Sequence, residues 1–424
     1  MKNSILAEGL IGSEILKIAG EVNAMIKNGE QVSNFTVGDF NSNYYPIPTL
    51  LKQYITEAYK DNQTNYPPSD GILELREAVI KFLHKRLGLQ YETNELLIAG
   101  GSRPLIYATY LSIVDKGDKV IYPIPSWNNN HYCYLTGADG VAVRTQASND
   151  FLPTAEDIKP HLNDAVLLAL CSPLNPTGTM FQEKALRDIC ELVIAENKRR
   201  SPDQKPLYIM YDHIYWLLTF GDTKHVDPVS LYPELKEYTI YIDGASKYFA
   251  STGVRVGWGF GPKNIIDKMK SILGHIGAWA PKAEQVAFAR FVENDTAVND
   301  YLQANETKLK TSLDALYAGI HQLKKEGFKV DAIAPAGAIY LTIQIDYLNA
   351  TAEDGTVLKN SMDINSYLIK EAKLALVPFN AFGTTNMIPW FRASVGACTV
   401  EDIERGIDNM RIALSQLSFL VQSS

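Results

Sequence analysis

The stretch from Thr239 to Pro262 reads TIYIDGASKYFASTGVRVGWGFGP. It contains two short apolar runs, 239–244 and 256–261, which are typical of strands buried on both faces of a sheet. Lys247 follows the first run, and Arg255 precedes the second. A lysine that leaves water must be paired or neutralised, whereas a solvated lysine needs no such setting. The position of Lys247 therefore indicates a functional site at the end of a buried strand.

The chain on the amino-terminal side of this stretch repeats the same alternation. Apolar runs at 118–125, 165–173 and 207–212 are also predicted to be buried strands. Segments with helical periodicity, such as 71–88 and 182–200, lie between them. Strands that alternate with helices predict an α/β fold with a mainly parallel sheet between helices. In such sheets, ligands bind beyond the carboxyl ends of the strands.

The last third of the chain has a different pattern. A long segment of helical periodicity covers 298–327, an alternating strand covers 337–346, and a closing helix is expected over 400–421. We predict a smaller α+β domain here, joined to the larger one by the long helix. The predicted division assigns 46–295 to a large cofactor-binding domain, and 1–45 with 296–424 to the small domain.

Composition narrows the class of protein. The 424 residues are 46% hydrophobic and 21% charged, with a net charge of −8, so we expect no nucleic-acid partner. No apolar run is long enough to span a membrane, and no signal peptide is expected. The cysteines lack CxxC spacing, which favours a reducing cytoplasm and predicts no metal site. They are Cys133, Cys171, Cys190 and Cys398.

Several predicted strands end in a polar or aromatic residue. Asp212 ends one apolar run, Lys247 follows another, and Asn175 lies in the turn NPTG. Trp127 follows a fourth run. Each has a common structural explanation when taken singly, such as an aspartate that caps a turn or a tryptophan in the core. Together, at the ends of neighbouring strands, they predict one shared crevice.

The chemistry of this set indicates a single ligand. A buried lysine without a carboxylate partner is a nucleophilic amine suited to a Schiff base. Asp212 suits a protonated pyridine nitrogen, and Asn175 with Tyr215 could hydrogen-bond a phenolate oxygen. A tryptophan could stack on the ring, and helix-opening amides with Arg255 could hold a phosphate. Pyridoxal 5'-phosphate requires all of these groups.

Seven ordered motifs carry a resemblance to a known family. They are NYPPSDGILELREAV, GGSRPL, PIPSW, NPTG, YDHIY, SKYFASTGVRVGWGFGP and WFRASVG, and they extend from Asn65 to Gly396. In these motifs the chain resembles the class I/II aminotransferases, which are pyridoxal-phosphate-dependent, of fold type I and aspartate-aminotransferase-like. The resemblance implies a homodimer that transfers an amino group from an α-amino acid to a 2-oxo acid by a ping-pong mechanism.

The resemblance also implies roles at the cofactor ring. Lys247 resembles the Schiff-base lysine, whose freed amine then acts as general acid and base. Asp212 would keep the pyridine nitrogen protonated, so that the ring acts as an electron sink. Tyr215 and Asn175 would bond the ring O3', and Trp127 would stack on the ring.

Further residues are implied at the phosphate. Arg255, Gly101 and Ser102 would bind it, and Tyr66 would reach it from a second subunit. The remaining residues that we predict to bind the cofactor are Gly100, Arg103 and Ser246.

The substrate is expected to meet another set. Arg392 resembles the arginine that grips the α-carboxylate with a bidentate fork, and Asn175 would lie beside it. Gly38 resembles a glycine whose backbone lies close to the substrate.

Some readings stay open from the sequence. A C–S lyase, a decarboxylase or a cyclopropane-forming synthase could use the same cofactor. A regulatory protein fused to a DNA-binding module is disfavoured, because no basic module fits before Tyr66. The lysine that aspartate enzymes of one branch carry is replaced by Ser102. Trp279 and the pair Tyr44 and Tyr45 would tolerate an aromatic or larger apolar substrate, and a place in the core fits them equally well. The amino donor is therefore left open.

Overall fold

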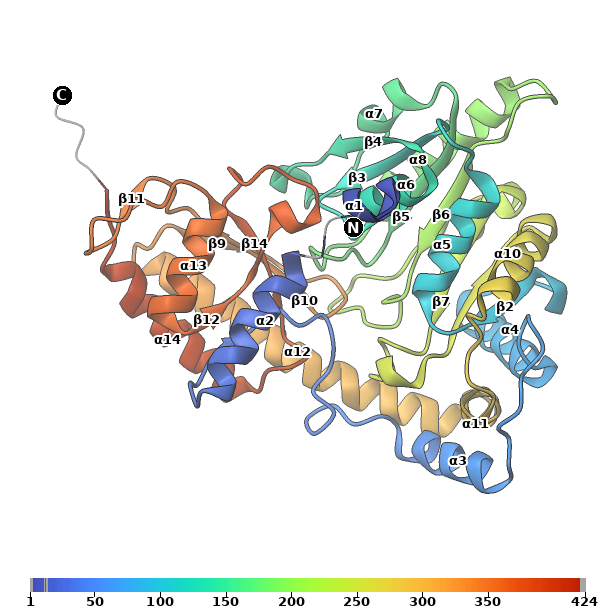
Figure 1. The fold of residues 1–424 in the computed structure, drawn as a ribbon, viewed down its shortest axis with the longest axis horizontal. Coiled ribbons are helices and arrows are strands. Elements are labelled where there is room, and N and C mark those ends of the chain that lie inside the picture. The colour runs from blue at the N-terminus through green and yellow to red at the C-terminus, as the bar shows by residue number, and fades with distance from the viewer. Residues whose placement is uncertain (1–2, 11, 13, 420–424) are drawn as a thin grey trace.

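A seven-stranded sheet forms the centre of the larger half of the computed structural model, which describes residues 3–10, 12 and 14–419 (Figure 1). Its strands, in spatial order, are β2 (Leu96–Ala99), β8 (Gly257–Phe260), β7 (Thr239–Gly244), β6 (Tyr208–Asp212), β5 (Ala165–Cys171), β3 (Lys119–Ile124) and β4 (Asp139–Arg144). The strands from β4 to β7 pair in parallel, whereas β8 runs antiparallel to both β7 and β2. The predicted α/β fold with a mainly parallel sheet is confirmed.

Both faces of this sheet are buried. Along β2, the side chains of Leu96 and Ile98 join one apolar cluster, whereas Leu97 and Ala99 join a second cluster on the other face. This alternation explains why the strands are continuously apolar in sequence. The helices of this half are α3 (Thr49–Lys60), α4 (Leu73–Leu87), α5 (Ser102–Ile113), α6 (Asn129–Thr136), α7 (Ala155–Ile158), α8 (Glu183–Arg199), α9 (Pro228–Leu231), α10 (Lys263–Ile276) and α11 (Lys282–Val292).

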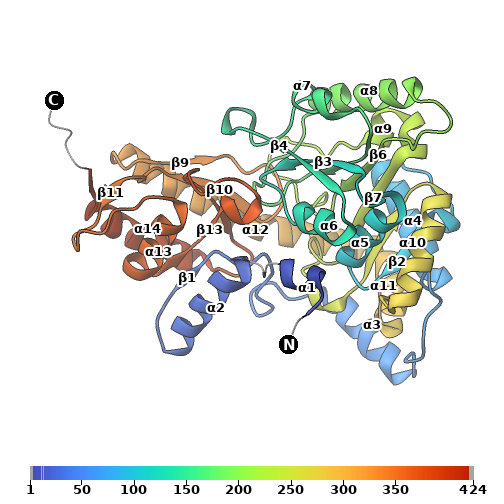
Figure 2. The same ribbon diagram turned by 45° about the horizontal axis from the view of Figure 1, so that its top comes forward.

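The smaller half contains an antiparallel sheet with helices beside it (Figure 2). Its strands are β13 (Val377–Pro378), β14 (Trp390–Ser394), β10 (Tyr340–Ile345) and β9 (Val330–Ile333), in that spatial order. Two short pairs add β1 (Ser33–Asn34) with β12 (Leu374–Ala375), and β11 (Ala350–Thr351) with β15 (Ser418–Phe419). The helices are α2 (Glu14–Lys27), α12 (Asp295–Lys325), α13 (Ser361–Ala372) and α14 (Val400–Ser415), whereas α1 (Ile5–Gly9) lies against α6 of the larger half, where the Tyr134 hydroxyl donates to Ile5 O and Leu6 O. The 3₁₀ helix η6 (Phe379–Phe382) also belongs to this half, whereas the larger half contains η1 (Thr93–Glu95), η2 (Ala147–Asn149), η3 (Lys159–His161), η4 (Pro233–Tyr238) and η5 (Thr252–Val254).

The helix α12 links the two halves. It has 31 residues, and Figure 1 shows it extending from the neighbourhood of α11 to the smaller sheet. Near the amino terminus, α2 packs Ile18 and Val22 against Ile369 and Ala375 of the smaller half. The predicted domain limits themselves stay a prediction.

The carboxyl-terminal end differs from the expected helix over 400–421. The helix α14 ends at Ser415, and the chain then forms β15, which pairs with β11. Phe419 packs against Tyr347, with ring centroids 5.7 Å apart, and this contact favours the strand. An apolar run so near a helix end fits either structure in sequence. Positions 420 and 421 lie outside the described residues.

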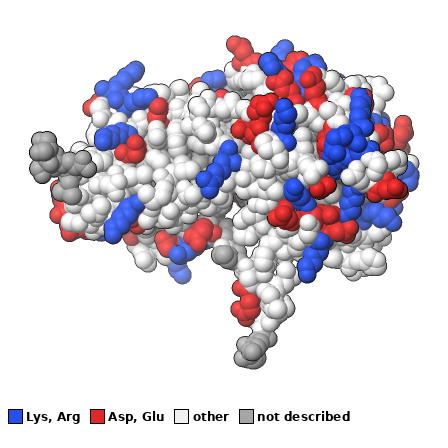
Figure 3. Space-filling model, turned by 90° about the horizontal axis from the view of Figure 1, so that it is seen from above, with Lys and Arg blue, Asp and Glu red and all other residues white. Residues whose placement is uncertain are grey.

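The surface carries both signs of charge. On the face shown in Figure 3, Lys and Arg side chains lie among Asp and Glu side chains.

Among the helices of residues 3–10, 12 and 14–419, none is both long and apolar enough to cross a membrane.

Candidate active site

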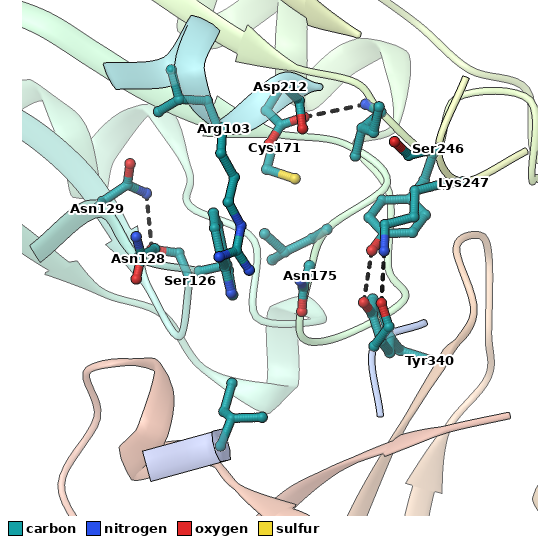
Figure 4. Close-up of a pocket in the computed structure, with 18 of the residues that line it drawn as sticks. Arg103, Ser126, Asn128, Asn129, Cys171, Asn175, Asp212, Ser246, Lys247 and Tyr340 are labelled. Carbon is teal, nitrogen blue, oxygen red and sulfur yellow. Dashed lines mark hydrogen bonds between the residues drawn. The ribbon is translucent and has the colours of Figure 1, made fainter. Parts of the chain in front are cut away.

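A cavity of about 670 Å³ lies at the carboxyl edge of the larger sheet, where it faces β10 and β14 of the smaller half. Register explains part of this convergence, because Cys171 at the end of β5 pairs with Asp212 at the end of β6. Most of the predicted site residues line the cavity (Figure 4). They are Gly38, Ser102, Arg103, Trp127, Asn175, Asp212, Tyr215, Ser246, Lys247, Arg255 and Arg392.

Asp212 is a half-buried carboxylate that lines the cavity. Its Oδ1 accepts a hydrogen bond from the backbone N–H of Ile214 at 3.2 Å. Burial raises the pKa of Asp212 to about 6, although the Ile214 amide and the charge of Lys247 act in the opposite direction. A carboxylate in this state gains from a cationic partner that enters the cavity.

Lys247 lies in the turn after β7 and reaches across the cavity. Its Nζ donates to the carbonyl oxygen of Gly38 at 2.6 Å (Figure 4). Burial lowers the pKa of Lys247 to about 8, with Asp39 opposing the shift and the arginines of the cavity adding to it. A substantial fraction of the amine is therefore neutral near pH 8, which makes it nucleophilic.

Arg255 is held by backbone carbonyls rather than by carboxylates. Its Nη1 donates to Thr252 O at 2.8 Å, and its Nη2 donates to Gly100 O at 2.7 Å. A Cβ on Gly101 would lie 2.2 Å from Nη2, so the guanidinium needs a glycine there. The helix α5 begins next to it at Ser102. A cation beside helix-opening amides forms an anion site.

Gly100 and Gly101, which we predicted to bind the cofactor, contact the guanidinium of Arg255 and are not among the residues that line the cavity.

Arg392 is a buried cation on β14. It is 2% exposed, and it donates from Nη1 to Asn175 Oδ1 at 3.2 Å and from Nη2 to Thr36 O at 2.7 Å. Its Nε is buried without a hydrogen-bond partner in the described part of the chain. Because an unpaired buried charge is costly, this arrangement favours an anionic ligand at Arg392.

Tyr340 of β10 also lines the cavity, although it is not among the residues predicted from the sequence. Its hydroxyl lies 2.6 Å from the hydroxyl of Tyr215, and both side chains are buried. A Cβ on Gly38 would lie 2.9 Å from the Tyr340 hydroxyl, which explains the need for glycine at that position. In sequence, Tyr340 lies in an alternating strand and looks like any core aromatic residue, so no local signal distinguishes it.

Arg103 lies at the open side of the cavity. Its guanidinium is 4.7 Å from the centroid of the Trp127 ring. It makes no ion pair with any carboxylate among residues 3–10, 12 and 14–419. Figure 4 shows it pointing into the cavity from α5.

Tyr66 does not reach the cavity of its own chain. It is 82% exposed, and its ring contacts Trp279 edge to face at 5.2 Å. Tyr44 and Tyr45 surround the amine of Lys308 instead of lining the cavity. The larger apolar substrate that these aromatic residues suggested is therefore not supported by their positions.

The cavity fits pyridoxal 5'-phosphate. It provides an amine with a lowered pKa, a carboxylate with a raised pKa and an arginine held by backbone carbonyls at the start of a helix. These groups match the aldehyde, the pyridine nitrogen and the phosphate of the cofactor, respectively.

Comparisons with known proteins agree with this arrangement. The sequence profile of the family described as "Aminotransferase class I and II" matches residues 30–410. A probable aspartate/prephenate aminotransferase of Rickettsia prowazekii is 29% identical over 376 residues, 88% of this chain and 90% of the relative. An aspartate aminotransferase of Geobacillus stearothermophilus is 29% identical over 396 residues, 92% of this chain and 93% of the relative.

A solved structure gives the same result for the fold. The aspartate aminotransferase of Rhizobium meliloti superposes with a TM-score of 0.88 and 25% identity, covering 99% of this chain and 100% of that chain. These names favour transamination over the lyase and decarboxylase alternatives. The chain therefore belongs to the class I and II aminotransferases, and it is a pyridoxal-phosphate-dependent aminotransferase.

Proposed function

We propose that this enzyme transfers the amino group of a dicarboxylic α-amino acid, of which aspartate is an example, and that the cavity residues above carry out the reaction. The observation that carries the site assignment is the convergence of Lys247, Asp212 and Arg392 on one cavity, since the Nε of Arg392 has no hydrogen-bond partner among the described residues. Bound pyridoxal phosphate supplies a carbonyl for the amine and an electron-withdrawing ring.

Lys247 has the central catalytic role. Its Nζ would be the nucleophile toward the cofactor carbonyl, and the free amine would take the proton from the substrate Cα as a general base. Its pKa of about 8 suits both tasks near neutral pH. The carbonyl of Gly38, which accepts from Nζ at 2.6 Å, orients the amine toward the cavity.

The larger half holds the cofactor. Asp212 would pair with the pyridine nitrogen, while Tyr215 and Asn175 would donate to the ring oxygen. Trp127 would provide the aromatic face against the ring. The phosphate is bound by Arg255 and by the start of α5, supported by Gly100, Gly101, Ser102 and Ser246.

Arg392 binds the substrate α-carboxylate. Its backbone and amide partners, Thr36 and Asn175, fix the guanidinium without neutralising it. A carboxylate provides the missing counter-charge and makes the strong, bidentate type of hydrogen bond.

Arg103 favours a second carboxylate on the substrate. Arg255 and Arg392 are assigned to the phosphate and the α-carboxylate. This leaves Arg103 as a further cation that faces the cavity and has no carboxylate partner in the part of the chain that the structure describes. The relatives are named aspartate and aspartate/prephenate aminotransferases, and aspartate and prephenate each carry two carboxylates. This assignment replaces our prediction that Arg103 contacts the cofactor.

The substrate class is tested by comparing aspartate with alanine as amino donor. In Arg103→Gln, kcat/KM for aspartate is expected to fall roughly 10- to 100-fold, because a charge-assisted hydrogen bond is lost. The value for alanine is expected to stay close to wild type, and Arg103→Lys is expected to retain part of the preference. Arg144→Gln, an exposed arginine outside the cavity lining, is the matched control. Equal losses for aspartate and alanine would overturn the second carboxylate site.

The enzyme is proposed to act as a homodimer. Tyr66 is exposed and remote from its own cavity, so its predicted contact with the phosphate requires a second copy of the chain. Gel filtration at working concentration is expected to give a dimer. A monomer with full turnover would make the assignment of Tyr66 wrong.

A cytoplasmic location is proposed as well. The four cysteines are free thiols, three of them buried, which suits a reducing compartment. Cell fractionation with detection of the intact protein is the test, and recovery outside the cytoplasm would contradict the proposal.

A further inference from the structure

Two tyrosine hydroxyls form a direct hydrogen bond inside the cavity. The oxygens of Tyr215 and Tyr340 are 2.6 Å apart, and both side chains are almost fully buried. Burial raises the pKa of each tyrosine, so both are neutral near pH 7. Each hydroxyl therefore has one proton to donate, and only one of the two can donate to the other.

The pair spans the two halves of the molecule. Tyr215 follows β6 of the larger sheet, whereas Tyr340 lies on β10 of the smaller sheet. The guanidinium of Arg392 lies 4.7 Å from the centroid of the Tyr340 ring. The hydroxyl of Tyr340 also fills the space that a side chain at Gly38 would need. Tyr340 thus contacts the elements that carry the substrate arginine and the partner of the lysine.

The surroundings of the pair contain few ionisable groups. The titratable or charged groups that face it are Arg392 on β14, Cys171 on β5, Asp39 and Lys247. The amine of Lys247 is 5.7 Å from the centroid of the Tyr215 ring. None of these groups hydrogen-bonds either hydroxyl in the part of the chain that the structure describes.

Proton counting assigns a direction to the bond. We propose that Tyr340 is a positioning residue that donates its proton to the oxygen of Tyr215, so that the proton of Tyr215 is directed to the phenolic oxygen of the bound cofactor. The inference rests on the proposed role of Tyr215 as a donor to that oxygen. If Tyr215 uses its single proton there, its oxygen is left to accept from Tyr340.

The chain of two hydroxyls strengthens the second donor. A hydroxyl that accepts one hydrogen bond becomes a better donor in the next, and the effect is largest where water is excluded. In the loaded enzyme, the phenolic oxygen and the nitrogen of Lys247 compete for one proton. A stronger donor at the oxygen favours loss of that proton from the nitrogen, and so lowers the pKa at which it leaves.

The test is a pH titration of the visible absorbance of the cofactor-loaded enzyme, which does not depend on turnover. Tyr340→Phe is expected to move the midpoint upward by roughly 0.3 to 1 pH unit, because one neutral hydrogen bond is lost from the chain. Tyr215→Phe is expected to move it further in the same direction. The double variant is expected to match Tyr215→Phe, since Tyr340 acts only through Tyr215.

A matched control separates this effect from general destabilisation. Tyr367→Phe removes another hydroxyl of the smaller half, which donates to Ala413 O at 2.7 Å outside the cavity, and it is expected to leave the midpoint unchanged. Circular dichroism and bound cofactor per chain check that each variant is folded and loaded.

The outcomes distinguish this inference from the proposed function. An unchanged midpoint in Tyr340→Phe, with a shift in Tyr215→Phe, overturns the role of Tyr340 and leaves that of Tyr215 intact. A double variant whose shift is the sum of the two single shifts also overturns it. An unchanged midpoint in Tyr215→Phe overturns the role of Tyr215 and, with it, the chain of hydroxyls.

Discussion

The expected reactivity of Lys247 comes from its burial and from the positively charged groups near its amine. Its amine faces one backbone carbonyl, and three arginines of the cavity add to the effect of burial on its pKa. An amine in water would be almost fully protonated at pH 8. Lys247, in the turn after β7, is therefore more often neutral, and so more nucleophilic, than an exposed lysine at the same pH.

Replacing Lys247 by alanine is expected to abolish catalysis without unfolding the chain. General acid–base contributions of this kind are worth roughly 10² to 10⁴ in rate, and loss of the nucleophile adds to this. Steady-state turnover and retained cofactor, measured on the same preparation, check the prediction. Lys268→Ala on α10, an exposed lysine, is the control. Wild-type turnover in Lys247→Ala would show that another lysine is the nucleophile.

The lowered pKa predicts how the cofactor-free protein reacts with pH. Because the pKa of Lys247 is about 8, only about one tenth of its amine is neutral at pH 7, and about nine tenths at pH 9. Reductive methylation of this lysine with formaldehyde, followed by peptide mass spectrometry, is expected to accelerate with pH and to level off above pH 9. The exposed Lys268 serves as internal reference. A rate for Lys247 that keeps rising to pH 10 would contradict the lowered pKa.

The position of Arg255 beside the start of α5 depends on a glycine at position 101. Gly101 has φ of +95°, and a methyl group there would meet the guanidinium of Arg255. Gly101→Ala is expected to weaken cofactor binding roughly tenfold or more, because Arg255 would be displaced from the phosphate. Titration of cofactor-free protein gives the dissociation constant. Gly20→Ala in α2, where a methyl group has open space, is expected to bind normally. Equal affinity in both variants would remove the proposed link.

The sequence predicts elements and strand ends better than it predicts contacts between them. Apolar runs locate β5, β6 and β7, because strands buried on both faces require such runs whatever their neighbours. The direction of β8 could not be predicted, since a buried run is the same for parallel and antiparallel pairing. Tyr340 was missed because its contact with Tyr215 depends on how the two halves meet. The prediction that the last helix continues beyond Ser415 was wrong. The chain there forms β15, and its pairing with β11 is a contact between residues far apart in sequence.

In the proposed homodimer, Tyr66 of one copy of the chain is expected to complete the cavity of the other copy. Mixed dimers of two inactive variants test this. Lys247→Ala and Tyr66→Ala are expected to be poorly active alone. After reassortment, about one quarter of wild-type activity should return, since half of the dimers are mixed and each has one intact site. Mixing Lys247→Ala with Asp212→Ala is the control, because both defects lie in one cavity and no intact site can form. Recovery in the control, or none in the test pair, would contradict the shared site.

The continuous helix α12 gives the enzyme a lever. Its 31 residues span about 46 Å at the rise of an α-helix. A tilt of about 5° at the end beside α11 would carry the other end through about 4 Å, which is more than the length of a hydrogen bond. The contacts that cross the cavity, Tyr340 with Tyr215 and Arg392 with Asn175, would then form or break together. A small rotation of α12 would therefore change two features of the cavity at the same time. These are the position of Arg392, which binds the substrate carboxylate, and the hydrogen bond between Tyr340 and Tyr215.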